Sequence, residues 1–201
     1  MKRLNAAEIF DLHSDAVKAW HQGQVISANE EWGPRVLIEH RLNYDLWHEE
    51  DEVRRRDVPD TVIAQVKRNI DRLNQQRNDA IEQIDLFFED YLRRQGLMNG
   101  QEIPLNTETP GNVIDRLSIL NLRLYHMQEQ SERTEISEEQ RNRCQERLQV
   151  LRIQKDNLAL AFQQFLDELF EGKRQFKVYH QMKMYNDPTL NPVLYQKPTR
   201  T

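Results

Sequence analysis

The segment from residue 42 to residue 57, LNYDLWHEEDEVRRRD, has the densest run of groups that could take part in chemistry. A helix through it would place Asn43, Trp47, Glu50 and Arg54 in one row, because they follow one another at spacings of four, three and four. A carboxylate there could accept a proton or a hydroxyl, an arginine could bind phosphate, and a tryptophan could stack on a ligand ring. A solvated, internally paired charged face is the competing interpretation.

Other polar residues occur where the apolar stripe of a helix is due to continue. These interruptions predict buried or half-buried polar groups, which need partners because an unpaired buried charge is costly. They fall in the middle of two long helices and near the start of a third. The residues are Asn74, Arg77 and Asn78 in the first helix, Lys155 in the second, and Asp115, Arg116 and Ser118 in the third.

Carboxylates and cations from four helices could neutralise one another around one pocket. We expect a shared polar site for an anionic ligand, because arginine and lysine donors suit phosphate. No reaction can be named, and the candidate general bases are Glu50, Asp51 and Asp115. The expected ligand-binding residues are Asn43, Trp47, Arg54, Asn74, Arg77, Asn78, Arg116 and Lys155.

Histidine spacing raises the question of a metal. His40, His48 and Asp51 share one helix face, and a carboxylate three residues before His48 loosely matches the Glu-x-x-His motif of ferritin-like bundles. No second helix repeats the motif, because His126 and His180 lack a carboxylate three residues earlier. There is also no glycine-rich phosphate loop and no nucleophile elbow. We therefore expect neither a metal nor a cofactor, and keep these three residues as the metal candidates.

Composition limits the partners and the compartment. The net charge of −5 is mild and mixed in sign, which disfavours nucleic acid as a partner. The single cysteine, Cys144, excludes an internal disulfide and a cysteine-rich zinc site, which suits a reducing cytoplasm. The first residues, MKRLNAAEIFDLHSD, are too charged for a signal peptide, and no long apolar run predicts a membrane span. A cytoplasmic protein is expected.

Capping residues, glycines and prolines divide the chain into helices. Asn5, Thr109 followed by Pro110, and Ser137 with Gln140 predict helix starts, while three glycines predict helix ends. No segment has the pattern of a strand. The predicted helices lie after Asn5 up to Gly23, at roughly 30–57, 60–95 and 110–131, from Ser137 to Gly172, and at 173–185, with an irregular tail from about 186.

This pattern predicts an all-α fold, a single-domain antiparallel bundle of about six helices. The helices at 60–95 and after Ser137 are the longest, and we expect them to lie side by side as its frame. The helix at 110–131 is apolar nearly all round, as expected of an element enclosed by neighbours. The helix after Ser137 also has enough apolar surface to pair with a copy of itself.

Four blocks of the chain resemble an uncharacterised bacterial family of helical proteins, a domain of unknown function. The blocks are LNYDLWHEEDEVRR, IDRLNQQRNDAIEQID, GNVIDRLSILNLRLYHM and YHQMKMYNDPTLNP. Members of that family tend to be encoded beside glycosyltransferases of lipopolysaccharide and surface-polysaccharide pathways. The resemblance implies an associated role in such a pathway and no particular activity. The anionic ligand expected from the arginine and lysine donors is then a sugar phosphate or a nucleotide sugar. The competing interpretation is a non-catalytic helical protein that docks on a glycosyltransferase. A metal-binding bundle is the weaker alternative.

A second uncharacterised family is similar to three of these blocks in a different order. Its pattern N..LW..ED..R matches Asn43 to Arg54, and its pattern lDKLsIL matches Ile114 to Leu120 with arginine in place of lysine at position 116. Its third pattern asks for a tyrosine where this chain has Lys183, so only Asn186 and Asp187 align. This resemblance adds Asn186 and Asp187 to the expected ligand-binding residues.

Overall fold

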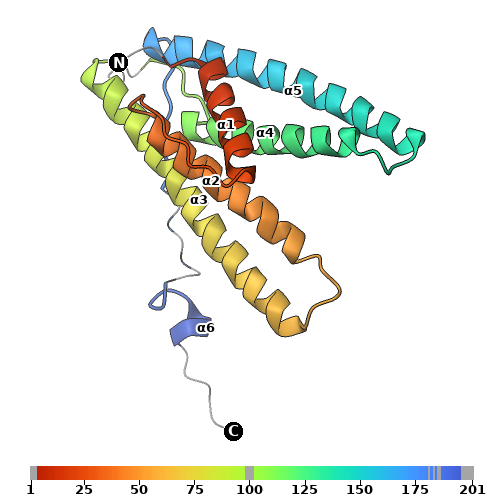
Figure 1. The fold of residues 1–201 in the computed structure, drawn as a ribbon. Coiled ribbons are helices and arrows are strands. Elements are labelled where there is room, and N and C mark those ends of the chain that lie inside the picture. The colour runs from red at the N-terminus through yellow and green to blue at the C-terminus, as the bar shows by residue number, and fades with distance from the viewer. Residues whose placement is uncertain (1–3, 98–101, 181, 183, 185–186, 196–201) are drawn as a thin grey trace.

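The computed structural model describes residues 4–97, 102–180, 182, 184 and 187–195. Within these residues the chain is helical, and the only pairing of strand type is an isolated bridge between Leu105 and Gln175. The predicted all-α class is therefore confirmed (Figure 1). The helices are α1 (Ala6–His21), α2 (Gly33–Glu52), α3 (Asp60–Arg94), α4 (Pro110–Glu132), α5 (Glu138–Phe170) and the single turn α6 (Pro192–Tyr195).

The predicted caps set the helix starts. Asn5 accepts a hydrogen bond from the backbone N–H of Ala7, and Thr109 accepts one from Asn112. Ser137 and Gln140 form the predicted capping box at the start of α5. At the other ends, the three expected glycines follow α1, α3 and α5 with φ between 68° and 72°, the left-handed conformation that glycine adopts at little cost.

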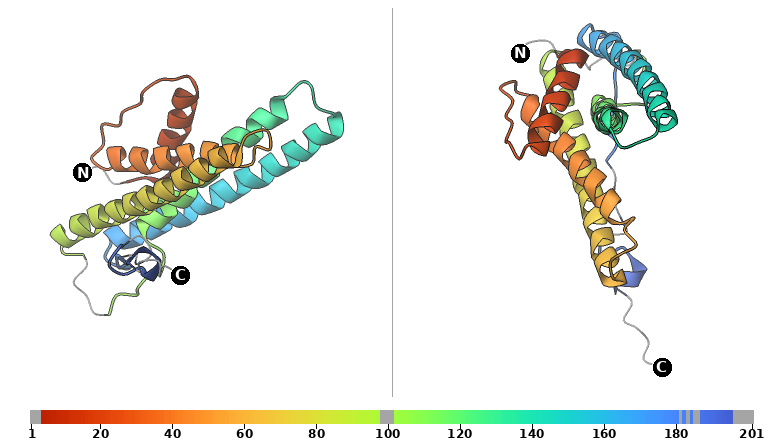
Figure 2. Two further views of the ribbon diagram at one scale, coloured as in Figure 1. Left: turned by 90° about the horizontal axis from the view of Figure 1, so that it is seen from below. Right: turned by 45° about the vertical axis from the view of Figure 1, so that its right-hand side comes forward.

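Two antiparallel hairpins, α2 with α3 and α4 with α5, form the frame of the molecule. The hairpins meet at one end and diverge toward the turns that join their helices, while α1 crosses α2 and α4 (Figures 1 and 2). The expectation that α3 and α5 lie side by side is wrong, because each of these long helices packs along a shorter one. Periodicity identified the apolar faces of α3 and α5 but not their partners.

Helix α4 is the central element. It contacts all four other long helices, which explains why its sequence is apolar nearly all round. The main core lies where the hairpins meet, and its largest fully buried side chains include Phe88 of α3, Leu117 of α4 and Phe162 of α5. A smaller cluster around Leu46 and Ile70 holds α2 against α3 in the diverging arm.

Two predicted segments differ from the structure. The helix predicted at 30–57 is shorter, Gly33–Glu52, and residues 53–59 form the turn to α3. The helix predicted at 173–185 is wrong over its described residues, which are extended or irregular. Gln175 exchanges backbone hydrogen bonds with Pro104 and Asn106, and Phe176 is fully buried in the main core. These contacts with distant residues outweigh the local helical pattern.

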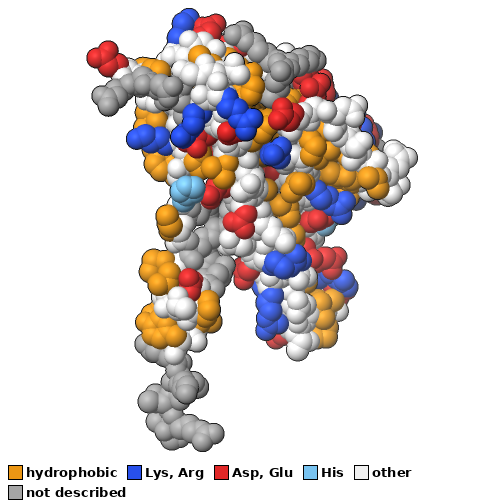
Figure 3. All heavy atoms as spheres, turned by 90° about the vertical axis from the view of Figure 1, so that its left-hand side faces the viewer, with side chains coloured by type: hydrophobic (Ala, Val, Ile, Leu, Met, Phe, Trp, Pro, Cys, Tyr) orange, Lys and Arg blue, Asp and Glu red, His pale blue; other side chains and the backbone are white. Residues whose placement is uncertain are grey.

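The surface carries charges of both signs. On the face drawn in Figure 3, basic and acidic side chains are interspersed with apolar ones, so that face has no uniformly basic patch. None of the helices in the described part of the chain is long and apolar enough to cross a membrane.

Candidate functional site

A buried polar network joins α2 to α4. The side-chain amide of Asn43 donates to Glu39 and, at 2.9 Å each, to Asp115 Oδ1 and Ser118 Oγ. Ser118 Oγ also lies 2.7 Å from His40 Nδ1. Glu39, His40, Asn43 and Ser118 are at most 4% exposed. The row predicted along α2 therefore begins inside the protein, and its first residue is held by α4.

Glu39 is the most deeply buried acid of this network. Burial raises the pKa of its carboxyl well above the ordinary value, and the nearby negative charge of Asp115 raises it further. A protonated Glu39 can share its proton with a neighbouring oxygen instead of adding a second negative charge. No interruption of an apolar stripe marks Glu39 in the sequence, although it precedes Asn43 by one helical turn.

A cavity of about 340 Å³ lies beside this network, between α2, α3 and α4. Seven of the residues predicted for the site line it, together with Arg123 of α4 and three apolar residues. The complete lining is Asn43, Leu46, Trp47, Glu50, Asp51, Arg54, Asn74, Arg77, Ile119, Leu122 and Arg123. The structure thus brings together the α2 row and the polar interruption of α3.

The arginines of this cavity differ in their partners. Arg54 is exposed and pairs with Glu50 one turn earlier, at 3.0 Å. Arg77 is only 26% exposed, and its Nε lies 3.8 Å from Asp115 Oδ1, which is an ion pair too long for a hydrogen bond. That Nε is buried and has no hydrogen-bond acceptor within the described residues. Arg77 is therefore a donor with capacity for a ligand.

A second cavity of about 730 Å³ adjoins the first, between the diverging hairpins. Trp47, Asp51 and Arg123 line both. The far wall of the second cavity is contributed by α5 and includes Val150 and Leu151. Together the two cavities form a groove that is polar on the side of α2 and α3 and more apolar toward α5.

Several predicted residues lie elsewhere. Arg116 is exposed on another side of α4 and pairs with Glu108 at 2.6 Å. Lys155 pairs with Asp156 and lies over the ring of Phe10. Neither lines the cavity between α2, α3 and α4, because each points from its helix toward a different neighbour.

Three more predicted residues can be placed relative to the site. Asp115 borders the cavity through Asn43 and Arg77 without lining it. Asn78 is half-buried on α3 and lines neither cavity. Asp187 accepts hydrogen bonds from Thr189 in the tail, and Asn186 lies outside the described residues.

The predicted metal candidates do not come together. His40 is fully buried, with Nδ1 bonded to Ser118 and Nε2 to the backbone carbonyl of His13. Burial lowers the pKa of His40 to about 3, so it is neutral at physiological pH. Asp51 is exposed at the rim of the cavities. Of the three candidates, only His48 lies beside other side chains that could bind a metal.

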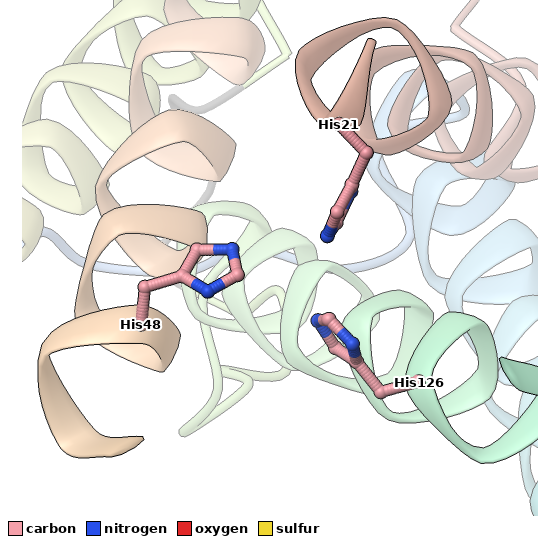
Figure 4. A group of neighbouring side chains, drawn as sticks. All are labelled: His21, His48 and His126. Atoms are coloured by element: carbon pink, nitrogen blue, oxygen red, sulfur yellow. The ribbon is translucent and has the colours of Figure 1, made fainter. Parts of the chain in front are cut away.

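His48 faces His21 of α1 and His126 of α4 (Figure 4). The three imidazoles lie among the rings of Tyr44 and Tyr125. The ring of Trp47 stacks on that of His126 at 4.7 Å, which places this cluster next to the cavities. Sequence spacing could not reveal three residues from three helices. The sequence contains one weak sign of this cluster: an aromatic residue directly precedes each of the three histidines.

Comparison with known protein families identifies a match. A family model described as a protein of unknown function, DUF4254, matches residues 35–178. No curated protein and no solved structure matches the chain. The matched region contains α2 from its third residue onward, all of α3 to α5, and with them the polar network and every residue that lines the two cavities. Since it covers well over half of the chain, the protein belongs to the DUF4254 family.

Proposed function

We propose that the cavity between α2, α3 and α4 binds a small anionic ligand, and that this ligand is a sugar phosphate or a nucleotide sugar. The observation that carries the proposal is the half-buried guanidinium of Arg77, whose Nε has no hydrogen-bond acceptor within the described residues. Burying such a donor is costly unless a partner arrives. A phosphate is a suitable partner, because guanidinium groups bind phosphate through two parallel hydrogen bonds.

The remaining lining suits the sugar part of such a ligand. Glu50 and Asp51 offer acceptors for hydroxyl groups, and Asn74 offers an amide. The ring of Trp47 provides an apolar wall on which a sugar or a base can stack. About 340 Å³ is near the lower limit for small-molecule sites, and the adjoining 730 Å³ provides room for a nucleotide.

The biological setting that we propose is an accessory role in the biosynthesis of lipopolysaccharide or another surface polysaccharide in bacteria. It is supported by the resemblance to families whose members tend to be encoded beside glycosyltransferases. Glu50, Asp51 and Asp115 remain the candidates for a general base. The proposal concerns binding, and it assigns no reaction.

The test is a thermal-stability and titration screen with glucose 1-phosphate, UDP-glucose, inorganic phosphate and glucose. We expect the phosphorylated compounds to stabilise the wild-type protein and glucose alone to have no effect. Arg77→Ala should lower the affinity about tenfold to a hundredfold, the loss expected for one hydrogen bond between charged groups. Arg116→Ala is the matched control, since Arg116 is an α4 arginine outside the cavity.

Two results would contradict the proposal. One is that no phosphorylated compound stabilises the protein at millimolar concentration. The other is that Arg77→Ala and Arg116→Ala reduce binding equally, which would mean that the anion does not bind specifically in the cavity lined by Arg77.

A second candidate function is that of a non-catalytic interaction protein that docks on a glycosyltransferase. It is favoured by an exposed face of α5, where Ile153 and Leu160 are each more than half exposed and line neither cavity. Ile153→Glu should then abolish co-purification with a co-expressed glycosyltransferase of a surface-polysaccharide pathway and leave anion binding unchanged. If co-purification survives Ile153→Glu, this face is not the docking surface.

A further inference from the structure

We propose that His21, His48 and His126 form a binding site for a divalent transition metal, with Zn²⁺ as the best-suited ion. One nitrogen of each imidazole lies within 4.8 Å of the other two. In Figure 4 the three rings, from the end of α1, from α2 and from α4, converge on a common space. This site differs from the weaker metal alternative of the sequence, which combined His48 with His40 and Asp51.

In two of the rings, the hydrogen bond made by Nδ1 leaves Nε2 available to bind a metal. His21 Nδ1 lies 2.9 Å from the backbone carbonyl of Val17, and His126 Nδ1 lies 2.8 Å from Glu129 Oε2. Both partners are acceptors, so each Nδ1 carries the proton and each Nε2 carries the lone pair. A ligand histidine whose other nitrogen donates to a carboxylate or a carbonyl is the usual arrangement in zinc proteins.

The nitrogen atoms that face the common space lack protein partners. His48 Nε2 and His126 Nε2 are buried and form no hydrogen bond within the described residues. Two buried polar atoms without partners are costly, and a metal ion would satisfy both. Hydrogen bonding among the rings could satisfy at most one of the Nε2 atoms of His21 and His126, because with both Nδ1 atoms protonated only a neutral His48 has a proton to donate.

Aromatic rings limit the movement of the imidazoles. The ring of Tyr125 stacks on His21 at 4.5 Å, and that of Trp47 stacks nearly parallel on His126 at 4.7 Å. The ring of Tyr44 contacts His48 edge-on. Stacked neighbours hold the rings near one orientation. Nitrogen atoms in a tetrahedral zinc site are about 3.3 Å apart, so the three nitrogen atoms, now within 4.8 Å of one another, would have to draw closer when an ion binds.

The donor set favours zinc among the divalent ions. Three neutral imidazoles suit Zn²⁺ and exclude Mg²⁺ and Ca²⁺, which require oxygen ligands. Three protein ligands also leave a fourth position for water or a substrate group, as in catalytic zinc sites. None of the three histidines lines the 340 Å³ cavity that holds Arg77, although His126 lines the adjoining one. Metal binding is measured without any anion, so a failure of the metal site can be told apart from a failure of the anion proposal.

The experiment uses untagged full-length protein that has been freed of metal with a chelator. Titration with Zn²⁺ should show one ion per chain at micromolar concentration, together with a rise in melting temperature. Co²⁺ should give the intense visible absorption of a four-coordinate nitrogen site. His126→Gln should abolish both signals, and Glu129→Gln should lower the Zn²⁺ affinity about 10-fold to 100-fold, the effect of losing the carboxylate behind a ligand.

The matched control is His180→Gln, because His180 also follows a tyrosine and pairs with a glutamate, Glu82, but lies outside the cluster. It should bind Zn²⁺ like the wild type. Circular dichroism without metal verifies that each variant is folded, and the exposed Glu129 provides a test that does not disturb the core. Equal Zn²⁺ binding by the wild type, His126→Gln and Glu129→Gln overturns the proposal, and so does the absence of binding by the wild type.

Discussion

Arg77 and Asp85 lie about two helical turns apart on α3, and their surroundings are opposite. Asp85 accepts hydrogen bonds of 2.6 Å from Thr109 Oγ1 and from the backbone N–H of Gly111. It thereby caps the start of α4 at the end where the hairpins meet. Arg77 borders a cavity where the hairpins diverge, and its Nε has no hydrogen-bond acceptor within the described residues.

This difference separates two uses of buried polar groups. At the joined end, each polar atom of the Asp85 contact has a protein partner, so its role is to fix the position of α4 against α3. At the open end, three buried nitrogen atoms have no hydrogen-bond partner among the described residues. They are Arg77 Nε, His48 Nε2 and His126 Nε2. Unpartnered polar atoms are tolerated where a ligand supplies the missing bond. Variants at the two ends should therefore affect different properties.

The largest effect is expected at the joined end, from Gly111→Ala. A Cβ at position 111 would lie 2.5 Å from the carbonyl oxygen of Ile81 and 2.8 Å from Asp85 Oδ1. The helices must separate to relieve this overlap, which should cost about 3 kcal/mol or more in the free energy of unfolding. Urea denaturation measures it. Gly23→Ala is the control with open space around it, and its cost should be about 1 kcal/mol.

The next effect is the pH dependence that Asp85 confers. Burial raises the pKa of its carboxyl from 3.8 to about 6, more than its two hydrogen bonds lower it. Between these values the folded chain holds a proton that the unfolded chain releases, so the contribution of Asp85 to stability grows as pH falls from above 6 toward 4. The gain between pH 7.5 and 4.5 is about 2 kcal/mol.

Asp85→Asn isolates this contribution, because asparagine does not titrate. Other groups act in the opposite direction, such as His40, whose pKa is lowered to about 3 and which therefore costs stability as pH falls below 6.5. These groups are present in both proteins, so their contributions cancel in the difference between the two unfolding free energies. A difference in unfolding free energy between wild type and Asp85→Asn that does not vary with pH would contradict the assignment.

Local signals explain how much of the fold was predictable. The helix starts at Asn5, Thr109 and Ser137 follow from caps that act within a few residues. The pairing of the long helices depends on contacts between distant segments, which periodicity does not specify. The same reason explains the failure at 173–185, where Phe176 enters the core and Gln175 binds the strand-like segment at 104–106.

The candidate site was predictable where one helix carries it. Asn43, Trp47 and Arg54 line the same cavity because the spacing of a helix fixes their common side. An interrupted stripe located Arg77 correctly near them but placed Lys155 there as well, since an interruption marks a face without naming the neighbour that covers it. The cluster of His21, His48 and His126 required the crossing of three helices, which only the tertiary structure provides.

The smallest effect on stability should come from Arg77→Met. Comparing it with Asn43→Ala gives the sharpest contrast between the two kinds of polar group. Asn43 is buried and donates to three acceptors, so its loss should cost about 2 kcal/mol or more in unfolding free energy. Arg77 forms one long ion pair and keeps its apolar packing as methionine, so that change should cost less than about 1 kcal/mol. Urea denaturation of both variants, with titration by glucose 1-phosphate, separates the roles: Arg77→Met should stay folded and lose anion binding. If Arg77→Met destabilises the protein as much as Asn43→Ala does, Arg77 belongs to the structural network and the open end holds no vacant donor for a ligand.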